Sequence, residues 1–105
     1  MISIHIALSN DFAGYINTSG IIADLSSNVV YTATENCIVA GSINLKMATY
    51  CYEQLNGQNI GTYSAPDNRN LYVSVYCPVK KGQTIKFQPS ETPHEFVVKA
   101  YRLLK

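Results

Sequence analysis

Residues 71–79, LYVSVYCPV, alternate strictly between apolar side chains and others, and no other feature limits the possible folds of this chain as much. Successive side chains of a β-strand point to opposite faces, so this period of two predicts a strand with one face in a hydrophobic core. The second face is unusual, because it carries Tyr72 and Tyr76 where a solvated strand usually has small or charged residues. The residues expected on the core face are Leu71, Val73, Val75 and Cys77.

The rest of the chain shows the same period of two, interrupted at short intervals by turn residues, and little helical periodicity. Asn56-Gly57 is the strongest hairpin signal, because both residues tolerate a positive φ. Gly82, after Lys80-Lys81, predicts a second turn, with the two lysines as the solvated tip of a hairpin. Residues 9–27 are rich in Ser, Asn and Asp and predict a long loop with a short strand near 20–22. Further strands are expected at 2–8, 28–34, 37–45, 47–55, 58–64, 83–88 and 96–104.

About eight short strands with turns every 8–12 residues or so are typical of an all-β fold, an antiparallel sandwich or barrel. A chain of 105 residues has room for one domain, and we therefore expect a single domain over 1–105. No linker, repeat or low-complexity segment divides the sequence.

Charged residues make up only 14% of the chain, against about 25% in an average soluble protein. Polarity comes instead from Asn, Ser and Thr, which total 25 residues. So weakly charged a surface gives little protection against association, which predicts an oligomer. A net charge of +1 gives no reason to expect nucleic acid as a partner. We expect neither membrane insertion nor a signal peptide, because the sequence has no apolar run of about 18 residues and MISIHIALSN has no basic start.

The strand expected at 96–104 also carries bulky residues on both faces. Only one face of each such strand can fill the interior, and apolar patches above a few hundred Å² are rare on monomers. Tyrosine suits a protein interface, because its ring buries area while its hydroxyl keeps a polar partner. We therefore predict a subunit interface, the alternative being scattered surface tyrosines without a role. The predicted interface residues are Tyr72, Tyr76, Val97, Tyr101 and Leu103.

The residues that usually carry chemistry are few and scattered. Cys37, Cys51 and Cys77 all fall in expected strands, and we interpret them as buried, reduced thiols of a protein folded in the cytoplasm. His5 and His94 are the only histidines, and the sequence has neither a C-x-x-C pair nor closely spaced His and Cys, so no metal site is expected. The acidic residues occur singly and no glycine-rich phosphate loop is present, so we expect neither catalysis nor a cofactor.

Two segments combine aromatic, amide and charged residues. An aromatic ring can cover the apolar side of a sugar, while amide, carboxylate and guanidinium groups bind its hydroxyls. The segment 61–72 and the cluster of Asp11, Phe12 and Tyr15 have this composition, although each is also compatible with an ordinary polar turn. The predicted ligand-binding residues are Tyr63, Asp67, Asn68, Arg69, Asn70 and Tyr15.

Four motifs follow one another over residues 31–105: YTATENCIVAGSI, LNGQNIG, LYVSVYCPVKKGQTIKF and VVKAYRLLK. The series resembles the C-terminal head domains of bacteriophage tail-fibre and receptor-binding proteins. Those domains are jelly-roll sandwiches similar to the C1q and tumour-necrosis-factor folds, and they assemble as trimers. Proline is usual in that family where this chain has Thr34, a Gly-aromatic pair where it has Asn36-Cys37, and Asp where it has Gln83.

The resemblance implies a jelly-roll homotrimer in a phage virion assembled in the host bacterial cytoplasm. On this basis we expect a fibre module that contacts other virion proteins and binds a host cell-surface glycan or protein receptor through its loops. One alternative is a purely structural virion module, which decorates the capsid or holds a trimer together without a receptor. Another is a C1q-like or lectin-like binding module of cellular origin.

Overall fold

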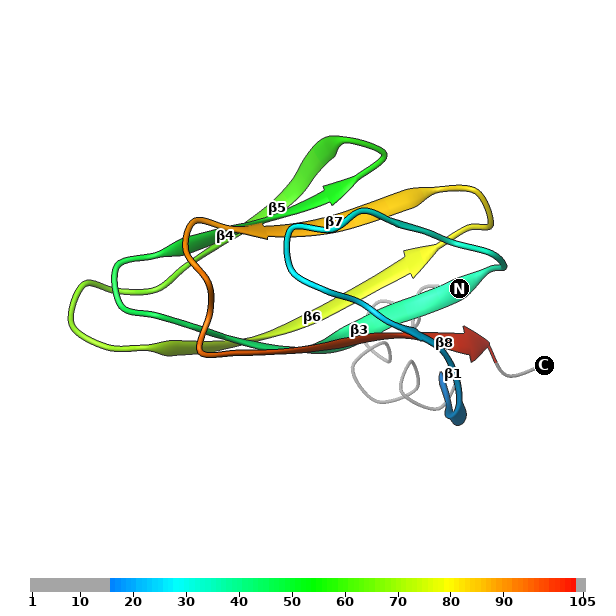
Figure 1. Ribbon diagram of the computed structural model, residues 1–105, viewed down its shortest axis with the longest axis horizontal. Helices are drawn as coiled ribbons and strands as arrows, with labels where there is room; N and C mark the ends of the chain where they lie inside the picture. The colour runs from blue at the N-terminus through cyan, green and yellow to red at the C-terminus, as the bar shows by residue number, and fades with distance from the viewer. Residues whose placement is uncertain (1–15, 104–105) are drawn as a thin grey trace, which may run out of the picture.

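The computed structural model describes residues 16–103, which form two four-stranded antiparallel sheets packed face to face (Figure 1). This part of the chain contains strands and turns and no helix. The strand expected at 2–8 and the candidate residues Asp11, Phe12 and Tyr15 lie outside the described residues. The expectation of an all-β antiparallel sandwich is confirmed for the described range, which contains eight strands.

Each strand in the first half of the chain pairs with its counterpart in the second half. β1 pairs with β8, β2 with β7, β3 with β6, and β4 with β5, as in one long hairpin folded at Asn56-Gly57. Pairing of β3 with β8 and of β4 with β7 completes the two sheets. The first sheet contains, in spatial order, β1 (Ile16–Asp24), β8 (Glu95–Leu103), β3 (Cys37–Leu45) and β6 (Leu71–Val79). The second sheet contains β2 (Tyr31–Thr32), β7 (Thr84–Pro89), β4 (Tyr50–Leu55) and β5 (Gln58–Ser64).

The strongest sequence patterns gave the best strand boundaries. β3, β5 and β6 cover the expected residues, and β7 and β8 are displaced by one residue from theirs. Asn56 and Gly57 have φ values of 52° and 81°, which makes the β4–β5 connection the tight hairpin expected from this pair. Gly82, with a φ of 89°, forms a turn as predicted.

The short strand expected near 20–22 is wrong in length, because β1 is a nine-residue edge strand. Its sequence contains Asn17, Gly20 and Asp24, residue types that are depleted in strands, so propensity gives only a weak sign of a long strand. Pairing with β8 holds the segment in place, with register shifts on both sides of Ile21. Tertiary contact therefore decides the conformation here rather than local preference.

Positive φ angles shorten two other expected strands. Asn28, with a φ of 63°, prevents a continuous strand over 28–34, of which only β2 is formed. Ala48, with a φ of 60°, forms a turn at the start of the segment 47–55, so β4 begins later than expected. A positive φ at alanine is uncommon, and nothing in the sequence pattern indicates it.

The hairpin expected with Lys80-Lys81 at its tip is also wrong. β6 and β7 are consecutive, but β6 pairs with β3 in the first sheet and β7 with β2 and β4 in the second. The turn at Lys80-Lys81-Gly82 therefore crosses from one sheet to the other (Figure 1). Ala33 holds this crossing in place, since its N–H donates to the Gln83 carbonyl and its carbonyl accepts from the Gly82 N–H, both at 2.9 Å. Turn residues such as Gly82 predict a short connection between two strands, but they do not indicate whether those two strands pair with each other.

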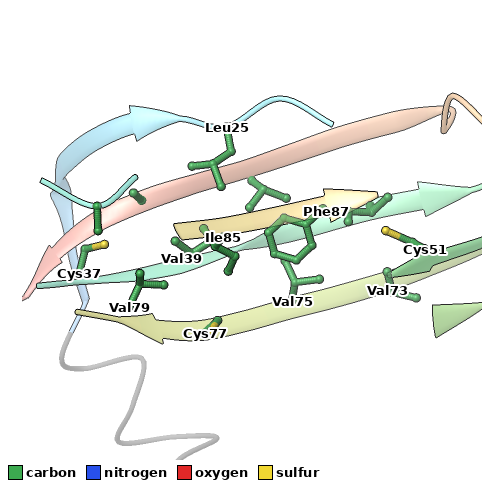
Figure 2. Close-up of a cluster of buried hydrophobic side chains, with 14 of the residues drawn as sticks. Leu25, Cys37, Val39, Cys51, Val73, Val75, Cys77, Val79, Ile85 and Phe87 are labelled. Carbon is green, nitrogen blue, oxygen red and sulfur yellow. The ribbon is translucent and has the colours of Figure 1, made fainter. Parts of the chain in front are cut away.

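The core lies between the two sheets and is filled by alternate residues of the strands (Figure 2). Phe87 and Ile85 of the second sheet meet Val39 and Val75 of the first, all of them almost inaccessible to water. Leu25, just after β1, covers one margin of this cluster. Every second residue of β6 is buried, and the residues between them are exposed, as the alternation predicts.

Candidate functional site

The outer face of the first sheet exposes several large apolar and aromatic side chains to solvent. Tyr72 is 65% exposed and Val97 is 45% exposed, both pointing away from the core. Tyr76 and Leu103 are also exposed on this face, and Tyr101 is half-buried. The five residues predicted from sequence as an interface therefore share one surface, which we call the aromatic face.

The register of the strands gives the aromatic face its shape. β3 runs along the middle, where Ala40 and Ser42 are small. Ala40 lies opposite Tyr76 of β6, and Ser42 lies opposite Val97 of β8. Cross-strand neighbours of this kind have Cβ atoms about 4.5–5.5 Å apart. Larger residues thus flank a lower central strip.

One end of the aromatic face is hollowed. The hollow has a volume of about 260 Å³ and is lined mainly by apolar groups, with Ile38, Pro78 and Leu103 among its walls.

Charge on the aromatic face is partly neutralised, because Lys99 Nζ lies 2.6 Å from Asp24 Oδ1. This hydrogen bond raises the pKa of Lys99, which is fully protonated at neutral pH. The arrangement suits contact with another apolar protein surface better than catalysis.

The predicted ligand-binding loop lies at one end of the sandwich, where the β3–β4, β5–β6 and β7–β8 connections gather (Figure 1). Asp67, Asn68 and Arg69 are exposed in a turn. Asn70 instead has a structural contact, because its Oδ1 accepts a hydrogen bond from the Met47 backbone at 3.1 Å. Ligand binding by this loop stays a prediction.

Tyr63 lies apart from the other predicted loop residues. Its hydroxyl donates a 2.7 Å hydrogen bond to Glu53 Oε1, and its ring packs against the core. Burial, followed by the nearby Glu53, strongly raises the pKa of Tyr63, so the phenol keeps its proton. The structure therefore brings Asp67, Asn68 and Arg69 together but directs the Tyr63 hydroxyl inward; Tyr15 lies outside the described residues.

Glu53 is a carboxyl group inside the core, which the sequence pattern did not lead us to expect. It is only 4% exposed, because on β4 it points to the same side as Cys51. Burial, then the charge of Glu53, raises the pKa of Cys51 to about 11. The same causes, with a hydrogen bond to Glu53, raise the pKa of Cys77 to about 11. The sequence did contain a signal for this position. Glu53 stands two residues after Cys51, which was expected in the core, and residues two apart on a strand point to the same face.

Removing the Tyr63 hydroxyl should destabilise the fold. Tyr63→Phe leaves a buried Glu53 oxygen without this donor, which should lower the free energy of unfolding by about 1–3 kcal/mol. Chemical denaturation monitored by circular dichroism measures the change. Tyr72→Phe is the matched control, since that residue is exposed and should shift stability by less than about 0.5 kcal/mol. Equal stability of the two variants would contradict the buried hydrogen bond.

The three cysteines should be inert in the folded protein. Cys37, Cys51 and Cys77 are free and buried, and burial raises the pKa of each, so the reactive thiolate is scarce at pH 8. We expect Ellman's reagent to modify the native protein at least about 100-fold more slowly than the unfolded chain. Unfolding in guanidinium chloride should release all 3 thiols. Rapid modification of one thiol in the native protein would contradict its buried position.

Within residues 16–103 no cluster of histidine, cysteine or acidic side chains is arranged to hold a metal ion. None of the described segments is a helix that could cross a membrane. His94 is exposed, and its backbone N–H donates to the Asn44 carbonyl at 2.9 Å. Comparison with known proteins found no match to this chain among protein families, curated proteins or solved structures.

Proposed function

We propose that this protein is a jelly-roll module that forms a homotrimer through its aromatic face and acts as the head of a phage fibre. The jelly-roll assignment is supported by the nested pairing of strands, each with its counterpart from the other end of the chain. Two four-stranded sheets wound from one such strip are what a jelly roll contains.

The aromatic face is the observation that carries the proposal. A lone subunit leaves Tyr72 and Val97 exposed to water, beside Tyr101 and Leu103 on the same surface. Burying these side chains against a second copy stabilises an assembly by roughly 25 cal/mol for each Å² of apolar area removed from water. Tyrosine hydroxyls at the margin of such a contact keep their polar partners. The number of three subunits comes from the family resemblance.

The virion setting is likewise proposed from the resemblance of four sequence motifs to those of phage fibre heads. The end of the sandwich that carries the exposed turn at Asp67, Asn68 and Arg69 offers the loops for a host receptor. Contacts stiffen this end, since the Ala48 N–H donates to the Pro66 carbonyl at 2.9 Å and the Tyr50 N–H to Ser90 Oγ at 3.0 Å. Three copies of a weak site would bind a cell surface more tightly than one.

Electron microscopy of the parent particle, labelled with an antibody to this chain, tests the setting. Label at the fibre tip is the expected result. Label on the capsid shell would favour the purely structural alternative, and particles without label would contradict a virion role. Host binding has a separate test. Purified protein at micromolar concentration should compete for the receptor and slow the adsorption of the particles to host cells. Unchanged adsorption would remove the receptor from the proposal and leave the structural module.

A further inference from the structure

We propose that the outer face of the second sheet is a saccharide-binding site centred on Tyr52, with a preference for sugars that carry a carboxylate. This surface faces away from the aromatic face, because the two sheets enclose the core between them (Figure 1). The inference does not rest on the virion setting or on the trimer. It names a site on the strands, separate from the predicted loop at 65–70.

Two tyrosines stand side by side on the solvent side of β4. Cys51 and Glu53 point into the core, so Tyr50 and Tyr52 point outward. Their ring centroids are 5.1 Å apart and the planes are inclined by 53°. Tyr50 is 42% exposed. The inclined rings form an open angle rather than a flat platform, which suits a single sugar ring better than a long flat chain.

Neutral polar side chains surround Tyr52 in the register of the sheet. Thr62 of β5 and Gln88 of β7 lie directly opposite Tyr52 on its two sides, at the short cross-strand separation. Gln54 follows on the same strand, and its Nε2 donates to Asn59 Oδ1 at 2.9 Å, which holds the amide in one orientation. Amide and hydroxyl groups both donate and accept, as recognition of sugar hydroxyls requires.

The charge of this surface complements an anion. Lys86 lies opposite Gln54, and its ammonium group makes no ion pair within residues 16–103. Glu53 is the only acidic residue of the four strands of the second sheet, and it points into the core. The strands around Tyr52 thus place one cation and no carboxylate on this outer face. A sugar carboxylate placed beside Lys86 would gain a charge-assisted hydrogen bond.

The chemistry of a pyranose matches these groups. One side of the ring is lined with C–H groups and can rest on a tyrosine ring, while its hydroxyls radiate toward the edges. Seated against Tyr50 and Tyr52, a sugar would direct hydroxyls toward Thr62 and Gln88. On β3, β6 and β8 the aromatic face of the first sheet carries a single amide, Asn44, beside the small residues Ala40 and Ser42. The two outer surfaces are therefore suited to different partners.

Titration of the ¹⁵N-labelled protein with short oligosaccharides tests the site, because NMR detects millimolar binding and maps it. The probes are hyaluronan, polygalacturonate and alginate oligosaccharides, with dextran oligosaccharides as the neutral arm. At least one acidic probe should shift amides of β4, β5 and β7. Tyr52→Ala should weaken that binding at least tenfold, and Lys86→Met should weaken it at least threefold without changing any binding of dextran. Lys81→Met is the matched control, because Lys81 is exposed in the turn between β6 and β7, and this variant should bind as the unmodified protein does.

Four outcomes would overturn the site. They are the absence of shifts with every probe, shifts confined to residues 65–70, binding of the neutral probe alone, and unchanged binding by a folded Tyr52→Ala variant. Should Tyr52→Ala fail to fold, Lys86→Met decides, because a half-buried lysine on the outer face of β7 is replaced by a side chain of similar length. A change of oligomeric mass in Tyr52→Ala would assign this surface to subunit contact instead and would also overturn the proposal. Adsorption of the parent particle is a separate readout, so failure here leaves the virion proposal standing.

Discussion

Gly41→Ala should prevent folding or lower the free energy of unfolding by at least about 3 kcal/mol. Gly41 lies in β3, in the middle of the first sheet, opposite Val75 on one side and Val98 on the other. A Cβ atom at this position would stand 2.7 Å from the Val98 Cα and closer still to the Val97 carbonyl oxygen. Both of these atoms belong to the backbone, so β3 and β8 would have to separate to make room.

Gly61→Ala is the matched control, because it makes the same change in another strand that has room for it. The nearest atom to the new methyl group would be Glu53 Oε1 at 3.8 Å, an ordinary contact. The free energy of unfolding of the Gly61→Ala variant should stay within about 1 kcal/mol of that of the unmodified protein. Thermal and chemical denaturation compare the three proteins. A Gly41→Ala variant as stable as Gly61→Ala would contradict the close approach of β3 and β8.

Val97→Lys should convert the assembled protein into a folded monomer. The substitution places an ammonium group in the middle of the aromatic face, which an apolar subunit contact would have to strip of water. We expect the dissociation constant of the assembly to rise at least about 100-fold, equivalent to about 2.7 kcal/mol. The fold itself should tolerate the change, because Val97 is 45% exposed in the single subunit.

Val30→Lys is the control variant, because it introduces the same positive charge outside the aromatic face. Val30 is 55% exposed and stands just before β2, at the start of the second sheet. The same substitution there should leave the sedimentation coefficient unchanged over a range of protein concentrations. Association that survives Val97→Lys would place the subunit contact elsewhere on the molecule.

Which side chains of a strand face the core was easier to predict from this sequence than which strands pair with one another. The alternation in β6 and β8 reflects which side chains meet the core, and a shift by one residue would expose all of them, so the pattern is strongly constrained. Pairing partners leave no such local trace. The turn at Lys80-Lys81-Gly82 therefore suggested a hairpin, although β6 and β7 lie in different sheets. β1 was underestimated because its pairing with β8, rather than its own residues, makes it a strand.

The candidate sites show the same difference between what alternation predicts and what depends on strand pairing. The five predicted interface residues share one surface because each was assigned from alternation. The loop residues were grouped by proximity in sequence, which could not show that the Tyr63 hydroxyl turns inward to Glu53. Tyr50 and Tyr52 were not predicted as a site, because their neighbours Thr62 and Gln88 come from other strands. Cross-strand register, absent from the sequence, brings those groups together.

The mass of the protein in solution tests the central claim, that the aromatic face joins copies of this chain, most directly. Light scattering coupled to size-exclusion chromatography measures it without assuming a shape. We expect three times the subunit mass of 11.6 kDa at micromolar concentration. A single species of 11.6 kDa at every concentration up to about 1 mM would contradict the claim, because Tyr72, Val97 and Leu103 would then face water in the functional protein.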